Sequence, residues 1–145
     1  MILFSSALEP VLENRIIMNK LVIDVANEKI FLMIITKDDI YNITKENTKI
    51  NYEKLTLIVK DFLYSNSLKL ADISKIYVNR GPGSFAGIRN SLSMVKAFNV
   101  TRKIDYYCYS FEDFKDQKDI KYEDIPNLCD KYKIKKNLIK PIYLS

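Results

Sequence analysis

The glycines are the residues of this chain whose spacing first suggests chemistry. All three, Gly81, Gly83 and Gly87, fall within seven residues. Glycine is needed where the backbone takes a positive φ or where two backbones approach closely, and Pro82 between the first two stiffens the turn. Two interpretations remain open. The loop is a phosphate cradle at the start of a helix, or it is a tight strand-to-helix turn packed beneath a neighbouring segment.

The spacing of these glycines matches neither of the common nucleotide-binding motifs. Gly87 follows Gly83 by four residues, and no Lys-Ser or Lys-Thr pair comes after it. The loop is therefore neither GxGxxG nor a P-loop. A small phosphate- or nucleotide-binding domain that uses residues 81–87 is retained as an alternative function.

Other catalytic chemistry has few candidate residues. The chain contains no histidine, so the commonest metal ligand and the commonest general base at neutral pH are absent. Cys108 and Cys129 match no metal-binding spacing, and we expect them to be small buried hydrophobic residues. We expect no catalytic residue, no metal site and no cofactor.

Composition predicts one globular domain. The chain has 145 residues, of which 48% are hydrophobic and 28% charged, and a chain of this length can bury a single core. No apolar run approaches the ~20 residues of a membrane-spanning helix. The first residues lack the charged start of a secretory signal, so the expected location is the cytoplasm.

The positive charge is concentrated towards the C-terminus. The net charge is +5, and residues 115–145 hold eight lysines and five acidic residues. Solvated surface lysines are one interpretation of this tail, and a tRNA-binding accessory module is another alternative function. The residues of this basic, partly aromatic strip are Lys131, Lys133, Lys135, Lys136 and Lys140, with Tyr132 and Tyr143.

The elements that would position these groups follow an α/β pattern. Three short strands are expected at residues 20–24, 29–36 and 39–44, as a meander, and a helix at residues 51–66. A strand at 76–78 leads into the glycine loop and a helix to about Thr101, followed by a strand at 104–109. Ser110 and Asp113 form an approximate capping box for a short helix at 110–114, and Ile125-Pro126 starts another helix.

The glycine loop also resembles a family signature. The string VNRGPGSFAGIRNSLSMVKAF is similar to the GPGSFTGLR motif and following helix of the TsaB/YeaZ family, with Ala86 and Ile88 as departures. Residues 21–24, 51–63 and 140–144 are similar to the family's first strand, first long helix and terminal Pro-x-Tyr-Leu motif, although Ser145 stands where the family has Arg. The matching signature residues are Gly81, Pro82, Gly83, Ser84, Phe85, Gly87 and Arg89.

The resemblance implies a fold and a domain division. Family members are considerably longer and fold as two actin-like (ASKHA, ribonuclease-H-like) lobes, so this chain is expected to be a shortened form that lacks most of the second lobe. Residues 18–114 would form one such lobe, with a mixed sheet, an antiparallel meander and two main helices. Residues 1–17 would be an extension or precede the true start at Met18, and residues 115–145 would be a remnant or replacement of the second lobe.

The resemblance also implies a function. TsaB-like proteins are non-catalytic scaffolds that support a TsaD-type catalytic subunit, and through it a TsaE-type ATPase, in the threonylcarbamoylation of adenosine 37 of tRNA. Active ASKHA enzymes place hydroxyl-bearing residues after the aspartate of the first strand, whereas Asp24 is followed here by Val25, Ala26 and Asn27. Asp24 is accordingly expected to cap a turn.

A supporting function requires a surface for the partner. The resemblance implies that the two main helices pack against the equivalent pair of the TsaD-type subunit, and the same surface can pair with a second copy of this chain. One stripe at helical spacing on each helix is the candidate surface, and the helix after the glycine loop carries a further stripe of Phe85, Ile88, Leu92 and Val95. The other interpretation is that the chain's own ends cover both helices. The residues of the predicted partner-binding set are Tyr52, Leu55, Val59, Phe62, Gly87, Ser91, Met94 and Phe98.

Overall fold

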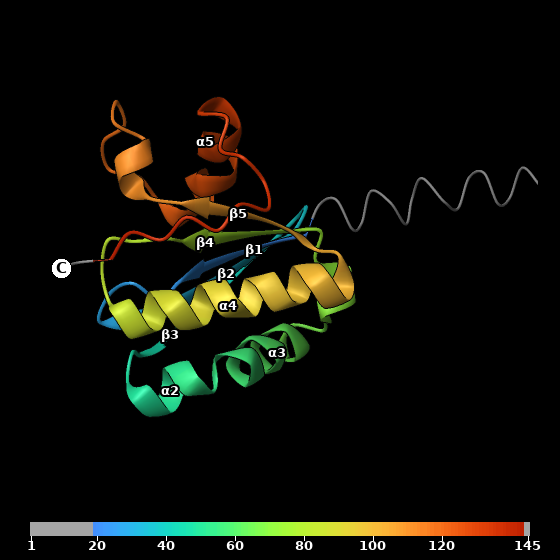
Figure 1. Ribbon diagram of the computed structural model, residues 1–145. Helices are drawn as coiled ribbons and strands as arrows, with labels where there is room; N and C mark the ends of the chain where they lie inside the picture. Colours follow the sequence, from blue (N-terminus) through green and yellow to red (C-terminus); the bar gives the residue numbers. More distant parts are fainter. Residues whose placement is uncertain (1–18, 144–145) are drawn as a thin grey trace, which may run out of the picture.

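The computed structural model describes residues 19–143, which fold around one five-stranded mixed sheet with the strand order β3-β2-β1-β4-β5 (Figure 1). β1 (Lys20–Asp24), β2 (Lys29–Ile35) and β3 (Ile40–Glu46) form an antiparallel meander. β4 (Lys75–Asn79) and β5 (Asp105–Tyr109) add to β1 in parallel. The predictions for residues 1–17, Leu144 and Ser145 lie outside the described part.

Three helices cover one face of the sheet, namely α2 (Lys49–Glu53), α3 (Leu55–Ser65) and α4 (Phe85–Arg102). The expected single helix at 51–66 is wrong in one respect, because it is divided at Lys54. Thr48 caps α2, and the Asn51 side chain donates to the backbone carbonyl of Glu46. These contacts tie α2 to the end of β3, while α3 runs beside α4.

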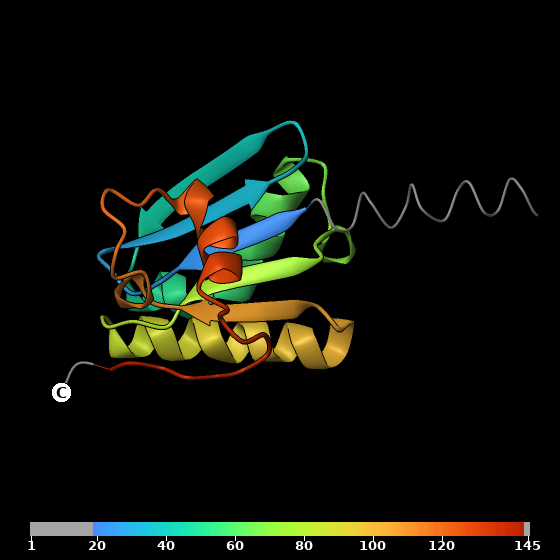
Figure 2. The same cartoon turned by 90° about the horizontal axis from the view of Figure 1, so that it is seen from above.

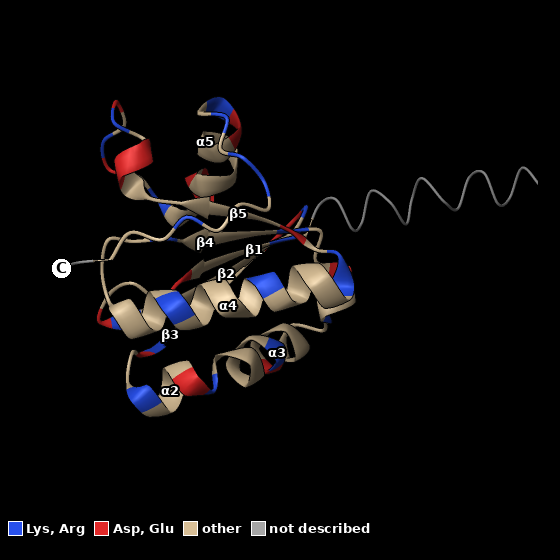
Figure 3. Cartoon of the chain, viewed as in Figure 1, with Lys and Arg blue, Asp and Glu red and all other residues tan. Residues whose placement is uncertain are grey.

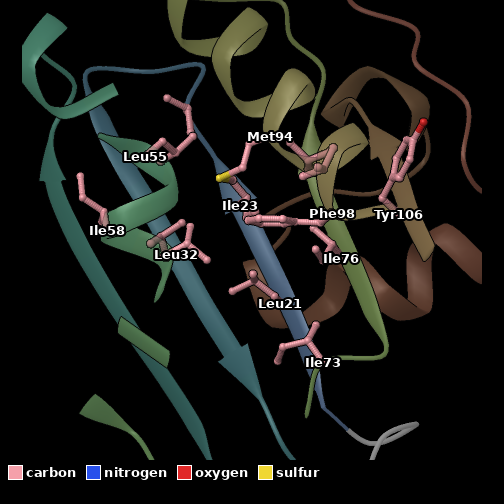
Figure 4. Close-up of a cluster of buried hydrophobic side chains, with 14 of the residues drawn as sticks. Leu21, Ile23, Leu32, Leu55, Ile58, Ile73, Ile76, Met94, Phe98 and Tyr106 are labelled. Carbon is pink, nitrogen blue, oxygen red and sulfur yellow. The ribbon is translucent and has the colours of Figure 1, made fainter. Parts of the chain in front are cut away.

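The main hydrophobic core lies between the sheet and these helices. Leu21 and Ile23 of β1 and Ile76 of β4 are fully buried there, against Met94 and Phe98 of α4 (Figure 4). The strands β1 and β4 carry near-continuous apolar residues because helices cover both faces of the sheet.

The opposite face is covered by the segment that we call the cap, residues 110–134. It consists of the 3-10 turns η2 (Phe111–Asp113) and η3 (Tyr122–Asp124) and the helix α5 (Ile125–Lys131). The capping box of Ser110 and Asp113 is confirmed, although the turn is 3-10. A second core forms beneath the cap. Its fully or largely buried members are Val22, Met33, Tyr77, Tyr109, Phe114, Ile125, Leu128 and Cys129.

The chain then returns along β5 in the segment that we call the strap, residues 136–143 (Figure 2). The backbone N–H of Asn137 donates to the Tyr106 carbonyl at 2.7 Å, and its side chain accepts from the Tyr106 N–H at 2.9 Å. Further on, the Ile142 N–H donates to the Arg80 carbonyl at 2.7 Å. The strap therefore satisfies part of the β5 edge, which would otherwise present unpaired backbone groups.

The predicted fold class is confirmed. The structure is a single α/β lobe with a mixed sheet, an antiparallel meander and a helical layer dominated by α3 and α4. Among residues 19–143, none of the helices combines the length and the apolar character that crossing a bilayer demands.

Candidate functional site

The glycine loop joins the end of β4 to the start of α4, and its glycines are positions of close approach. Gly81 has a φ of +110°, and a Cβ there would overlap the Ile142 carbonyl of the strap. A Cβ at Gly83 would overlap the Ala26 carbonyl, and one at Gly87 the Val25 carbonyl. Each glycine thus lets the loop or helix touch another backbone.

Three of the six N–H groups of this loop bind within the chain. Gly81 donates to the Asn79 side chain at 2.8 Å, and Ser84 donates to the Ala26 carbonyl at 2.9 Å. The Gly87 N–H donates to the Ser84 hydroxyl, which caps α4. The adjoining hollow is lined by Glu28 and uncharged residues. The geometry favours the packed turn over the phosphate cradle, because the three glycines lie against backbone carbonyls and the one charged residue in the lining is acidic.

Two further signature residues, Phe85 and Arg89, point outward. Phe85 is largely exposed, and its ring lies 4.5 Å, centroid to centroid, from that of Tyr143 in the strap. Arg89 is exposed on α4. The signature therefore holds the start of α4 on the sheet and holds the strap beside it.

Asp24 is buried at the end of β1 with both carboxylate oxygens engaged. One oxygen accepts from the Ala26 N–H at 3.0 Å, so Asp24 caps a turn. The other accepts from the Asn27 side chain at 3.3 Å and from the Tyr122 hydroxyl of the cap at 2.6 Å. Burial and the Asp24 charge raise the pKa of Tyr122, so this phenol stays a donor. Sequence reasoning missed Tyr122, which stacks on Phe31.

Arg80, next to the glycine loop, was also missed. Its side chain forms an ion pair with Asp113 of the cap at 2.6 Å and donates to the Lys140 carbonyl of the strap at 3.2 Å. Its backbone N–H donates to Tyr109 at the end of β5. One residue thus links β4, β5, the cap and the strap.

The two cysteines are buried, as predicted. Burial raises the pKa of Cys108 to about 11 and that of Cys129 to about 12. Both thiols are neutral near pH 7, so neither is an activated nucleophile.

The predicted partner-binding set is corrected by the structure. Seven of its members are buried within this chain, and Tyr52 is half-buried. Met94 and Phe98 lie in the core, so both apolar stripes of α4 are used internally. The physical reason is that α3 packs against α4, and the sheet and α3 together cover a wider arc of α4 than the sheet alone. The seven buried residues are Leu55, Val59, Phe62, Gly87, Ser91, Met94 and Phe98.

A different set of residues faces away from the sheet on the same helices. We call it the outer helical face. Ile50 is 67% exposed, Leu57 56%, Tyr64 78% and Val100 66%. Leu57 and Tyr64 are seven residues apart on α3, and so share one side of that helix. The small exposed residues Ser93 and Ala97 lie on α4 with Val100.

Parts of this chain are similar to known proteins. A family model described as TsaD, tRNA N6-adenosine threonylcarbamoyltransferase, matches residues 46–110, from the end of β3 through β5. The chain is 25% identical over 87 residues to a protein of Buchnera aphidicola subsp. Schizaphis graminum (strain Sg), named tRNA threonylcarbamoyladenosine biosynthesis protein TsaB.

Part of this chain is similar to TsaB. Its fold is that of YeaZ from Pseudomonas aeruginosa, with a TM-score of 0.59 at 19% identity over 64% of this chain. A second structure, an uncharacterized protein with similarity to peptidase YEAZ from the same organism, gives a TM-score of 0.60 at 19% identity, again over 64% of this chain. The recognition from the glycine signature is thereby confirmed.

The TsaB-like chain corresponds to part of these relatives. The match covers 60% of this chain and 41% of the Buchnera protein, and the two structural matches cover 44% and 43% of the YeaZ chains. The chain therefore spans less than half the length of the relatives it matches.

Proposed function

We propose that this TsaB-like chain is a non-catalytic subunit that supports a TsaD-type enzyme in the threonylcarbamoylation of adenosine 37 of tRNA, in the cytoplasm. The observation that carries the proposal is the outer helical face, which exposes large apolar side chains within the TsaD-like segment 46–110. Exposed apolar surface of this kind is typical of protein interfaces. A TsaE-type ATPase and the tRNA would be engaged through the catalytic subunit.

The likeness of this helical layer to TsaD supports that partner. Related surfaces pair readily around a two-fold or pseudo-two-fold axis, because each side presents the same helices to the other. Ser93 and Ala97 are small and exposed on α4, so a partner helix can approach closely there. A second copy of this chain would use the same face, so a homodimer and a complex with the TsaD-type subunit exclude each other.

The arrangement around Asp24 supports a non-catalytic function. Both of its oxygens bind donors of this chain, and the hollow beside the glycine loop has no Lys or Arg in its lining. A nucleotide-binding enzyme is the rival, favoured by the match to a transferase family model. It predicts measurable ATP or phosphate affinity of the isolated chain that is lost on changing the loop at 81–87.

The deciding experiment is co-expression with the TsaD-type protein of the same organism and purification through a tag on one of them. We expect stoichiometric capture of the wild-type chain and at least ~10-fold weaker capture of the double variant Leu57→Glu/Tyr64→Glu, because a buried unpaired carboxylate opposes an apolar contact. Both residues are exposed in the free chain, so its circular dichroism and melting temperature should stay close to wild type.

Ile40→Glu is the matched control. Ile40 is 46% exposed on β3, the edge strand of the sheet, and not on the helices. It should leave capture unchanged. A folded wild-type chain that never captures the TsaD-type protein would contradict the proposal, as would capture that ignores the double variant. Light scattering of the isolated chain tests the homodimer.

A further inference from the structure

A basic hollow lies between the end of β4, the cap and the strap. It has a volume of about 270 Å³, and Lys133, Lys135 and Lys140 line it together with the apolar side chains of Ile134 and Leu138. The sequence predicts a strip of five lysines and two tyrosines. The structure brings three of those lysines to one concavity.

The positive charge of this hollow is uncompensated. Asp113 is the one acidic residue in the lining, and its two oxygens accept from Arg80 at 2.6 Å and from the Ser110 N–H at 2.8 Å. None of the three lysines forms an ion pair with any residue between 19 and 143. By contrast, Lys136, which does not line the hollow, lies 3.7 Å from Asp105. A concave surface with one sign of charge concentrates the field that attracts anions.

The backbone that carries the lysines is held in place on both sides. The Ile134 N–H donates to Cys129 at 2.9 Å, and Asn137 is bonded to Tyr106 and to the Asp105 side chain. The Lys140 carbonyl accepts from Arg80. Figure 3 shows the blue segments of the chain that follow α5 and descend beside β5. A ligand would therefore order only the lysine side chains, which lowers the entropy cost of binding.

We propose that this hollow binds phosphate groups of an RNA backbone, and specifically those of tRNA. The inference rests on the proposed function, which supplies the RNA. The two aromatic residues of the strip are engaged elsewhere, since Tyr132 packs on Phe114 and Tyr143 on Phe85. Contact is therefore made by lysine with phosphate and not by rings with bases, so binding depends strongly on salt and weakly on sequence.

The test is tRNA binding by the isolated chain, measured by fluorescence anisotropy over a series of salt concentrations. We compare wild type with Lys133→Gln/Lys135→Gln/Lys140→Gln. The expected result is at least ~10-fold weaker binding and a slope of log K against log salt that is shallower by about 2–3, since each lost phosphate contact removes about 0.7–0.9.

The matched control removes the same charge from the cap. Lys115, Lys118 and Lys121 are exposed and do not line the hollow, so their triple Gln variant should weaken binding less than ~2-fold. The Lys→Arg triple at 133, 135 and 140 should retain binding, which separates loss of charge from loss of folding. Equal weakening by both Gln triples, or no measurable tRNA binding by the wild type, would overturn the proposal.

Two further experiments distinguish RNA binding from small-anion binding and from the proposed subunit function. Inorganic phosphate is titrated into the chain, and saturable phosphate binding without tRNA binding would reassign the hollow to a small anion and overturn the RNA inference. Leu57→Glu/Tyr64→Glu should keep tRNA affinity, and the lysine triple should keep capture of the TsaD-type subunit. If the wild-type chain binds tRNA but does not capture the TsaD-type subunit, the proposed function is contradicted and the RNA-binding assignment of the hollow still stands.

Discussion

At the scale of single residues, the contact between Asp24 and Tyr122 joins the two halves of the fold. Asp24 is the last residue of β1, and the uncharged, hydroxyl-free residues that follow it predict a turn cap in place of a phosphate site. Tyr122 lies 98 residues further along the chain and reaches Asp24 from the cap. No local pattern in the sequence links the two, because the contact exists only when the cap lies on the sheet.

Tyr122→Phe should destabilise the chain by about 1–3 kcal/mol, because the buried Asp24 carboxylate loses a donor while the stacking on Phe31 is kept. Urea unfolding followed by circular dichroism measures the change. Tyr41→Phe is the control, since Tyr41 is exposed on β3 and should change stability by less than ~0.5 kcal/mol. An equal effect of the two variants would show that the hydroxyl of Tyr122 contributes nothing.

At the scale of elements, the placement of α4 on the sheet depends on glycine. Gly87 lies in the first turn of α4, directly against the backbone of Val25 at the end of β1. Clustering of the glycines in the sequence predicted either close approach or an anion site. The choice between them needed the positions of Val25 and Ala26, which lie in the turn after β1.

Gly87→Ala should destabilise the chain by about 1–3 kcal/mol, because the added methyl group overlaps the Val25 carbonyl and α4 must move. The sign of the change in the free energy of unfolding is informative, since replacing Gly by Ala within a helix is by itself stabilising by about 1 kcal/mol. Thermal and urea unfolding of the variant measure the change.

Ala97→Ser on the exposed side of the same helix is the comparison and should cost no more than ~0.5 kcal/mol. A Gly87→Ala protein as stable as wild type, or more stable, would mean that the approach of α4 to β1 is looser than the structure has it.

The assignment of the two stripes of α4 also belongs to this scale. Helical periodicity grouped one apolar stripe and one stripe of small and large residues on this helix, and every member of both is buried except Phe85. The members are Phe85, Ile88, Leu92 and Val95 in the first stripe and Gly87, Ser91, Met94 and Phe98 in the second. Periodicity does not state how many neighbours a helix has. Because α3 lies beside α4, both stripes are covered except at Phe85. Leu57 and Tyr64, two of the exposed apolar residues of the layer, are ones that the pattern had assigned to no surface.

At the scale of the whole molecule, the sheet is covered on both faces and its core holds several titratable groups. Burial raises the pKa of Cys108 to about 11 and of Cys129 to about 12, and it also raises the pKa values of Tyr77 and Tyr109. These groups stay protonated in the folded chain at pH values where the unfolded chain releases its protons.

Stability should therefore be fully present below about pH 8 and fall as the pH rises past the pKa values of unfolded cysteine, about 8.5, and tyrosine, about 10. Urea unfolding between pH 7 and about 10.5 should show a steady decrease in the free energy of unfolding above about pH 8.5. At pH 8, a thiol reagent should modify neither cysteine in the native chain and both in urea. Rapid native labelling, or a free energy that is flat with pH, would contradict the burial of these groups.

The features that depend on neighbours along the chain could be predicted from short stretches of sequence. Turns, caps and periodicity act over a few residues, so short-range patterns predict several features. These are the meander, the strand that leads into the glycine loop, the helix after it and the capping box at Ser110. The family resemblance likewise rests on a short string of residues.

The covered surfaces and the contacts between distant groups could be found only in the folded chain. Several features depend on segments that are far apart in the sequence. They are the cap on the second face, the Asp24–Tyr122 contact, the links made by Arg80, the outer helical face and the convergence of Lys133, Lys135 and Lys140. The physical reason is that burial is a property of the packed whole. An amphipathic pattern states that a face is apolar, whereas the element that covers it is set by the packing of the complete chain.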